Sequence, residues 1–444
     1  MHTGRNIIKL NRSNKRMQML LISILIAVLL VPLIIVAPVT AAPYLDIDAK
    51  AAILVDNNSG KILYAKNIDE ALEPASMSKM MTEYLILEQI KKGGIAWDDI
   101  VVASEYAAWM GVNGGSAVYL AKGERHTVRE LFYAVAIASG NDATVALAEY
   151  ISGSETAFAK LMNEKAREMG LNDTHFVTST GYPADELGQY RPAISGQNEM
   201  SARDAATLAW YLINDFPGLR EISSQTKLVF RPGQEHTNVN FMLPGLIFAY
   251  EGLDGVKTGH TSQAGYCFTG TAERDNIRLI SVVFATSSLE KRASETRKLL
   301  NYGFNNYERI QLVGATQSVS GSEELAIAKG RQRTVKGVAD ESLYLVIERG
   351  ERANYKATYE LAEDVVAPIR KGDVLGTISY IHQQDGETFD AVYLNDSFRE
   401  LEQVKLVADV DVDRSGVISL FFRGVGDMFS KVYNVIADTF KKLF

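Results

Sequence analysis

Two side chains near the start of the chain could form a nucleophile and its base. Ser76 lies in EPASMSKMMTEYLILEQI, residues 73–90, where apolar residues recur at helical spacing. A helix that begins near Pro74 would place Lys79 one turn beyond Ser76 on the same face. Lysine can take the proton of a serine hydroxyl once burial or a nearby positive charge lowers its pKa. The spacing predicts a Ser-Lys pair, and a capping Ser beside an exposed Lys is the alternative for this motif taken alone.

Two further polar motifs follow along the chain. YAVAIASGNDATVALAEY holds the motif Ser139–Asn141 between two apolar helical runs, and GLDGVKTGHTSQAGYCF holds Lys257–Gly259 just before a predicted strand. Each motif alone has a simpler explanation as a short polar turn. Ser-x-x-Lys, Ser-x-Asn and Lys-Thr-Gly in this order form the motif set of active-site-serine enzymes that react with penicillin. The three together therefore favour acyl transfer through Ser76.

These motifs and the elements around them resemble the low-molecular-mass penicillin-binding proteins that are D-Ala-D-Ala carboxypeptidases. The resemblance covers the whole chain and is closest to the vegetative carboxypeptidase of Gram-positive, spore-forming bacteria. It implies a β-lactamase/transpeptidase-like serine-enzyme domain, a peptidoglycan pentapeptide substrate and inhibition by β-lactams. No cofactor is expected.

The resemblance also implies a role for each motif residue. Ser76 would be the acylated nucleophile and Lys79 its general base. Ser139 would relay protons, and Asn141 would contact the peptide backbone of the substrate.

The third motif would bind the substrate. Lys257 and Thr258 would face its carboxylate, and Gly259 would let an extended substrate lie against the strand edge. Backbone N–H groups of Ser76 and His260 would form an oxyanion hole.

An arginine completes the set of residues that the resemblance implies. Arg292, in EKRASETRKLL, occurs where the family places an arginine near the terminal carboxylate, with Lys291 and Arg297 as competing cations. A separate deacylation base of the class A β-lactamase type is less favoured than a solvated loop. Its candidates are Asp185, Glu186 and Glu199.

The elements that must position these residues read as one α+β unit. Strands at 51–55 and 62–65 form a hairpin, a helical block spans about 76–216, and strands return at 265–272 and 277–285 before a helix over 289–302. We expect one antiparallel sheet to join the early and late strands. Loops are predicted at 110–116 and 181–198.

Beyond residue 307 the pattern becomes one of short alternating runs, which predicts a small all-β domain that acts as a spacer or binding module. We find no catalytic constellation in it. The predicted boundaries are a signal peptide at 1–42, a catalytic domain at 43–307, an all-β domain at 308–411 and a tail at 412–444.

The first 42 residues have the pattern of a secretory signal. Five basic and no acidic residues accompany an apolar run from Met17 to Val36 and small residues at 39–42. A retained membrane span is the alternative. The expected location is therefore the extracytoplasmic face of the membrane.

Composition excludes several other classes of protein. The formal net charge of −8 becomes −13 once the five basic residues of the leader are removed. A chain this acidic is a poor match for nucleic acid, whose phosphates require clustered Lys and Arg. Cys267 has no partner for an internal disulfide, and the six histidines are scattered, so we predict no metal site.

The C-terminal segment is amphipathic. Residues 414–444 contain five basic and two acidic side chains. An aromatic-rich face beside a basic one is typical of helices that lie in a membrane interface, with docking on the protein itself as the alternative. We expect the regular helix to begin after Gly424 and Gly426. Its apolar face is Phe422, Val425, Phe429, Val432, Val435, Ile436, Phe440 and Leu443.

Three other functions share the same motifs. A β-lactamase would hydrolyse penicillin fast, and a DD-endopeptidase or transpeptidase would differ only in its substrate. A penicillin-sensing module would be acylated once and would not turn over.

Overall fold

The computed structural model describes residues 45–443. Its central element is an antiparallel five-stranded sheet in the order β2-β1-β9-β8-β7. The early hairpin thus pairs with the late strands through β1 and β9, from Ala51 opposite Phe284 to Asp56 opposite Leu279. The predicted α+β architecture is confirmed. The strands are β1 (Ala51–Asp56), β2 (Ile62–Lys66), β7 (Leu253–Thr261), β8 (Gly265–Arg274) and β9 (Ile277–Thr286).

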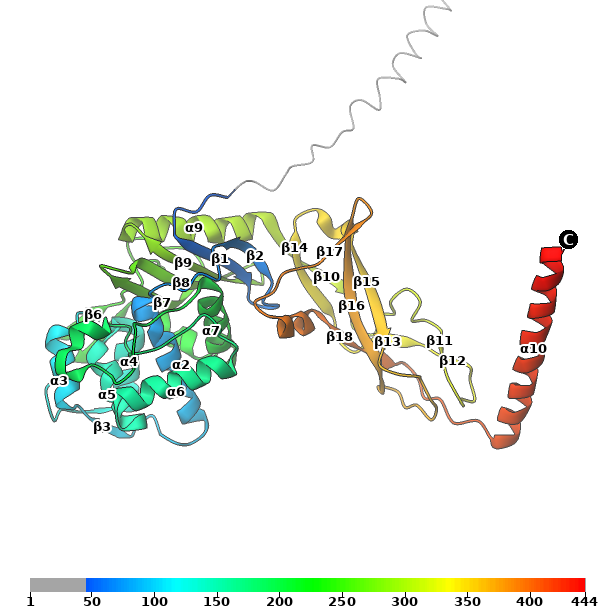
Figure 1. The fold of residues 1–444 in the computed structure, drawn as a ribbon, viewed down its shortest axis with the longest axis horizontal. Coiled ribbons are helices and arrows are strands. Elements are labelled where there is room, and N and C mark those ends of the chain that lie inside the picture. Colours follow the sequence, from blue (N-terminus) through cyan, green and yellow to red (C-terminus); the bar gives the residue numbers. More distant parts are fainter. Residues whose placement is uncertain (1–44, 444) are drawn as a thin grey trace, which may run out of the picture. The chain divides into compact units, whose positions relative to one another are not determined.

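Helices cover both faces of this sheet, as Figure 1 shows. Helix α9 (Leu289–Asn306) packs on β8 and β9 from one side, and α7 (Ala202–Asp215) packs on β1 and β9 from the other. The apolar face of α7 forms one core with the side chains that β1 and β9 turn toward it, and the buried residues of α9, such as Leu299 and Leu300, cover the other side of the sheet. The rest of the helical block is the 3₁₀ turn η2 (Ala75–Ser78), α2 (Lys79–Lys91), α3 (Glu105–Asn113), α4 (Val128–Ala138), α5 (Asn141–Ser152), α6 (Glu155–Glu168) and α8 (Leu219–Ser223).

Two predicted loops contain more helix than expected. Helix α3 continues to Asn113, so the loop expected at 110–116 is shorter than predicted, and the 3₁₀ segment η3 (Ala184–Tyr190) occupies part of 181–198. Ser104 caps α3 by accepting a hydrogen bond from the Ala107 N–H, which fixes its start. Two small antiparallel sheets accompany the block: β3 (Ile100–Val102) pairs with β4 (Arg125–Thr127) across α3, and β5 (Lys227–Arg231) forms a hairpin with β6 (Gln234–Thr237).

The β-rich part forms its own sheets and core, as predicted. One sheet has the order β13-β18-β16-β15, with β17 paired to β16, and β10 pairs with β14. Its strands are β10 (Tyr307–Val313), β11 (Leu325–Ala326), β12 (Thr334–Val335), β13 (Gly337–Ala339), β14 (Leu343–Glu348), β15 (Tyr355–Leu361), β16 (Val374–Gln384), β17 (Glu387–Phe389) and β18 (Val404–Ala408).

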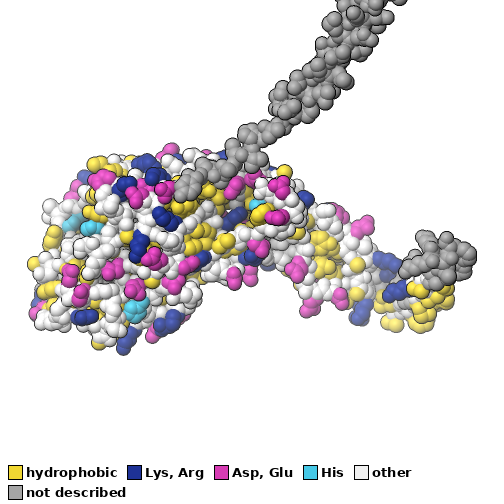
Figure 2. Space-filling view, turned by 45° about the horizontal axis from the view of Figure 1, so that its top comes forward, with side chains coloured by type: hydrophobic (Ala, Val, Ile, Leu, Met, Phe, Trp, Pro, Cys, Tyr) yellow, Lys and Arg dark blue, Asp and Glu magenta, His cyan; other side chains and the backbone are white. Residues whose placement is uncertain are grey.

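The C-terminal helix α10 spans Val417–Leu443 and therefore begins before Gly424 and Gly426, contrary to the prediction. A helical glycine costs about 1 kcal/mol relative to alanine, which two positions in a long helix can tolerate. Exposed apolar side chains gather on α10 in Figure 2. Phe422 and Phe429 of this helix have exposed fractions of 68% and 66%. Within residues 45–443 no helix is both long and apolar enough to cross a bilayer. The signal-peptide prediction lies outside the described residues.

Candidate active site

The predicted Ser-Lys pair is in contact. Lys79 Nζ lies 2.9 Å from Ser76 Oγ, and the two are hydrogen-bonded. Ser76 is half-buried in η2, and Lys79 is the first residue of α2 and fully buried. The Ser76 hydroxyl does not cap either helix, because neither η2 nor α2 has a side-chain capping bond. The alternative of a capping serine beside an exposed lysine is therefore wrong.

The electrostatics of Lys79 suit a base. Burial holds the pKa of Lys79 well below its usual value, and the positive charge of Lys257 lowers it further. Carboxylates of Glu83, Glu155 and Asp142 oppose the shift. An amine with a lowered pKa can take the hydroxyl proton of Ser76 near neutral pH.

A backbone segment that the sequence analysis did not single out holds the lysine in place. The Thr180 carbonyl accepts a 2.8 Å hydrogen bond from Lys79 Nζ, and the Ser179 carbonyl accepts one of 2.7 Å from Thr82 Oγ1. Gly181 has a φ of +73°, and a Cβ there would collide with the Ala75 carbonyl. The segment must therefore carry glycine to approach η2 this closely.

Asn198 ties this segment to η2. Its Oδ1 accepts hydrogen bonds of 2.8 Å from the N–H groups of Val177 and Thr178. Its Nδ2 donates to Ser78 Oγ at 2.9 Å and to the Thr178 carbonyl at 2.8 Å. The side chain is 6% exposed, so one buried amide fixes the backbone that positions Lys79.

The second motif lies where α4 passes into α5. Ser139 ends α4 in the left-handed conformation, with φ of 56°, and Asn141 is the first residue of α5. Asn141 Nδ2 donates to the Gly114 carbonyl. Its Oδ1 is buried and has no partner among the described residues. A free amide oxygen beside a serine suits a bond from the N–H of an extended peptide.

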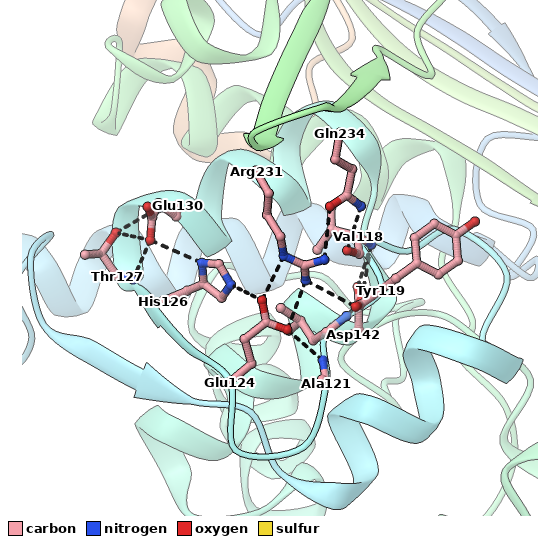
Figure 3. Close-up of polar contacts among 11 residues, drawn as sticks. Val118, Tyr119, Ala121, Glu124, His126, Thr127, Glu130, Asp142, Arg231 and Gln234 are labelled. Atoms are coloured by element: carbon pink, nitrogen blue, oxygen red, sulfur yellow. Dashed lines mark hydrogen bonds and ion pairs between the residues drawn. The ribbon is translucent and has the colours of Figure 1, made fainter.

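A polar network holds the chain beside this motif, and Figure 3 shows it. Asp142, next to Asn141, accepts hydrogen bonds from the N–H groups of Val118 at 3.1 Å and Leu120 at 2.9 Å. From the β5–β6 hairpin, Arg231 donates to the Tyr119 carbonyl at 3.1 Å. The same arginine forms an ion pair with Glu124, 2.8 Å from Nε to Oε1. The loop at 118–124 is thereby fixed from both sides.

The third motif joins the second through a lysine. Lys257 Nζ donates a 2.7 Å hydrogen bond to Ser139 Oγ. Lys257 and Thr258 are both buried, on the edge strand β7 of the central sheet. Burial lowers the pKa of Lys257 to about 8, with Glu83 opposing and Arg292 adding to the shift.

Gly259 has a structural reason that the sequence analysis missed. A Cβ at this position would collide with the Pro74 carbonyl of the chain entering η2. Strand β7 can therefore lie directly against η2, which places the backbone at His260 beside the turn that carries Ser76.

Arg292 is a buried cation of α9. It is 7% exposed. Burial lowers the pKa of both His260 and Lys257, and the charge of Arg292 lowers each of these pKa values further. The competing cations point elsewhere: Lys291 pairs with Asp48 at 2.7 Å, and Arg297 donates to the Phe248 carbonyl at 2.9 Å.

The three loop carboxylates considered as deacylation bases have other surroundings. Asp185 accepts a hydrogen bond from Gln197 Nε2, and Glu186 accepts one from Tyr182 OH. Glu199 is exposed. The simpler account of a solvated loop holds for these side chains.

A half-buried serine is hydrogen-bonded to a buried lysine, and a second serine, at the end of α4, is bonded to a buried lysine of the edge strand β7. This arrangement is typical of serine enzymes that form an acyl intermediate. Residues 37–288 match the family model described as D-alanyl-D-alanine carboxypeptidase, and residues 307–414 match that of the penicillin-binding protein 5 C-terminal domain. The chain belongs to the D-alanyl-D-alanine carboxypeptidase family.

Individual relatives agree with this assignment. The chain is 38% identical to the D-alanyl-D-alanine carboxypeptidase DacF of Bacillus subtilis over 86% of its length and 90% of that protein. It is similar to the crystal structure of a peptidoglycan synthesis regulatory factor from Streptococcus pneumoniae, with a TM-score of 0.74 and 30% identity. The match covers 83% of this chain and 100% of that one. It is also similar to penicillin-binding protein D2 from Listeria monocytogenes in its ampicillin-bound form, with a TM-score of 0.51 and 31% identity. That match covers 59% of this chain and 99% of the other.

Proposed function

We propose that the protein removes the terminal D-Ala from peptidoglycan stem peptides through an acyl-enzyme on Ser76. The contact between Ser76 and a fully buried Lys79 carries the proposal. Family membership supports the substrate class, because the relatives are named D-alanyl-D-alanine carboxypeptidases.

In the first step, Ser76 Oγ attacks the carbonyl carbon of the penultimate D-Ala while Lys79 takes the hydroxyl proton. Backbone N–H groups of Ser76 and His260 stabilise the negative charge on the carbonyl oxygen. The C–N bond then breaks, and the terminal D-Ala leaves after its nitrogen receives a proton through Lys79 or Ser139. Water hydrolyses the ester and restores Ser76.

Substrate binding in this account uses the other side chains of the site. Lys257, Thr258 and Arg292 receive the terminal carboxylate, and Asn141 holds the peptide backbone. A penicillin presents a carbonyl and a carboxylate in a similar arrangement, so it would acylate the same serine. The ampicillin-bound relative supports β-lactams as ligands of this family.

The direct test measures D-Ala released from a peptide ending in D-Ala-D-Ala. The protein is expected to release one D-Ala per peptide over many turnovers. Binding of labelled penicillin without any release of D-Ala would favour the sensing module instead. Rapid hydrolysis of penicillin would favour a β-lactamase. Cleavage of cross-linked peptide dimers without any release of terminal D-Ala would favour an endopeptidase.

We further propose that the chain is secreted, with a signal peptide at 1–42, a catalytic domain at 43–307 and an all-β domain at 308–411, and that its tail at 412–444 lies in a membrane interface. Exposed Phe422, Phe429 and Val435, at 66–68%, support burial of this face in lipid. The start of α10 also contacts the protein, because Arg423 donates to the Gly330 and Arg331 carbonyls. Truncation after Arg414 is expected to release active enzyme from membranes. A truncated protein that still sediments with them would refute the anchor.

A further inference from the structure

The active site contains a buried carboxylate that the mechanism above does not use. Glu83 lies on α2 four residues after Lys79, which places it one turn further along the same helix face. It is 1% exposed, and its Oε1 has no hydrogen-bond partner within the described part of the chain. A carboxylate buried in this way is costly unless nearby positive charge compensates it.

Two buried lysines supply that charge. Burial raises the pKa of Glu83 to about 7, and the charges of Lys257, which is 1% exposed, and Lys79, which is 0% exposed, oppose that shift. Lys257 has the larger influence. Among the charged groups, Glu83 has the largest effect on the pKa of Lys257, which it raises against the effect of burial. Lys257 has the largest effect on the pKa of Lys79, which it lowers in addition to burial.

Other charged groups around α2 act differently. Asp142 on α5 and Glu155 on α6 raise the pKa of Lys79, and Arg292 on α9 lowers that of Lys257. Carboxylates of α4 and α7 have partners of their own: Glu130 pairs with His126, Asp215 accepts from Tyr84 OH, and Asp204 accepts from Thr174 Oγ1.

The two lysines must differ in charge for the proposed chemistry. Lys79 has to be neutral to take a proton, and Lys257 has to be protonated to bind a carboxylate. Burial disfavours charge on both, so burial alone does not separate them. We propose that Glu83 is a positioning residue that keeps the proton on Lys257, whose charge in turn keeps Lys79 neutral. This inference rests on the roles proposed above for the two lysines.

The test is the pH dependence of acylation by benzylpenicillin in the full chain carrying Glu83→Gln. At the pH where Lys257 titrates, Glu83 is ionised, and loss of its negative charge lowers the pKa of Lys257. The alkaline limb of the profile is therefore expected to move to lower pH by about one unit. With Lys257 starting at about 8, the rate at pH 8 is expected to fall about five-fold. Glu83→Asp, which keeps the charge, is expected to retain the wild-type limbs.

Glu88→Gln is the matched control, because Glu88 lies on the same helix but pairs with Lys92 and Lys165. It is expected to leave the profile unchanged. A merely structural role for Glu83 would lower the rate equally at every pH. Unchanged limbs in Glu83→Gln, with the adduct still on Ser76, would overturn this inference and leave the proposed function standing. If Glu83→Gln fails to fold, Glu83→Met, which is uncharged and of similar length, provides the same comparison.

Discussion

Replacing Asn198 by leucine tests whether one buried amide holds the lysine base in place. The side chain is close in size but removes every hydrogen bond that Asn198 makes with η2 and the segment after Phe176. The N–H groups of Val177 and Thr178 would be left buried without a partner. Each costs about 1–3 kcal/mol, so we expect the catalytic domain to lose about 3 kcal/mol of stability.

Tryptophan fluorescence during urea unfolding measures this loss. All three tryptophans, Trp97, Trp109 and Trp210, precede the β-rich part of the chain, so the signal reports the catalytic domain. With a slope of about 3 kcal/mol per molar urea, the midpoint is expected to fall by about 1 M. Asn172→Ala, at an exposed position, is the control and should leave the midpoint within error.

Acylation provides the second readout for Asn198→Leu. Under conditions where the variant is folded, the acylation rate is expected to fall at least about ten-fold, because the Thr180 carbonyl no longer holds Lys79 Nζ at a fixed distance. A wild-type midpoint, or a lowered midpoint with an unchanged acylation rate, would refute the argument that Asn198 positions the base.

Two further predictions concern β7. Gly259→Ala places a methyl group against the Pro74 carbonyl, so acylation is expected to fall about 100-fold as β7 moves off η2, and an unchanged rate in a stopped-flow assay would show that the contact is not needed. In the wild-type protein, acylation is expected to rise with pH as Lys79 loses its proton and to fall above about pH 8 as Lys257 loses its own. A rate that keeps rising to pH 10 would contradict the role of Lys257.

Much of the fold followed from patterns in the sequence. The hairpin at the start of the catalytic domain and the strands after residue 265 have runs typical of strands, and only an antiparallel sheet could bury both. The motif residues were also predictable, because Ser76 and Lys79 are one helical turn apart whatever the rest of the chain does.

The supporting contacts could not be predicted in the same way. Lys79 is held by the backbone carbonyl of Thr180, and every residue has such a carbonyl, so no side-chain type marks it. Gly259 was expected to leave room for an extended substrate. In the structure it also leaves room for the Pro74 carbonyl, which lies nearly two hundred residues earlier in the chain. Glu83 places a charge among the apolar residues of its helix, and this is the sequence signal that marks it.

Helix α10 begins earlier than predicted because the helix penalty of glycine is small compared with the preference of the surrounding residues. Gly424 and Gly426 each cost about 1 kcal/mol, but residues on both sides favour a continuing helix. Local propensity sets a preference at such positions and does not by itself end a helix.

The central claim is that Ser76 is the residue acylated in this protein. Intact-mass measurement after incubation with benzylpenicillin tests it most directly, with Ser139→Ala as a companion that keeps the Ser76 hydroxyl. We predict an increase of one penicillin mass in the wild-type protein and none in Ser76→Ala, although that variant keeps its fold. An adduct of the same mass on Ser76→Ala would contradict the account.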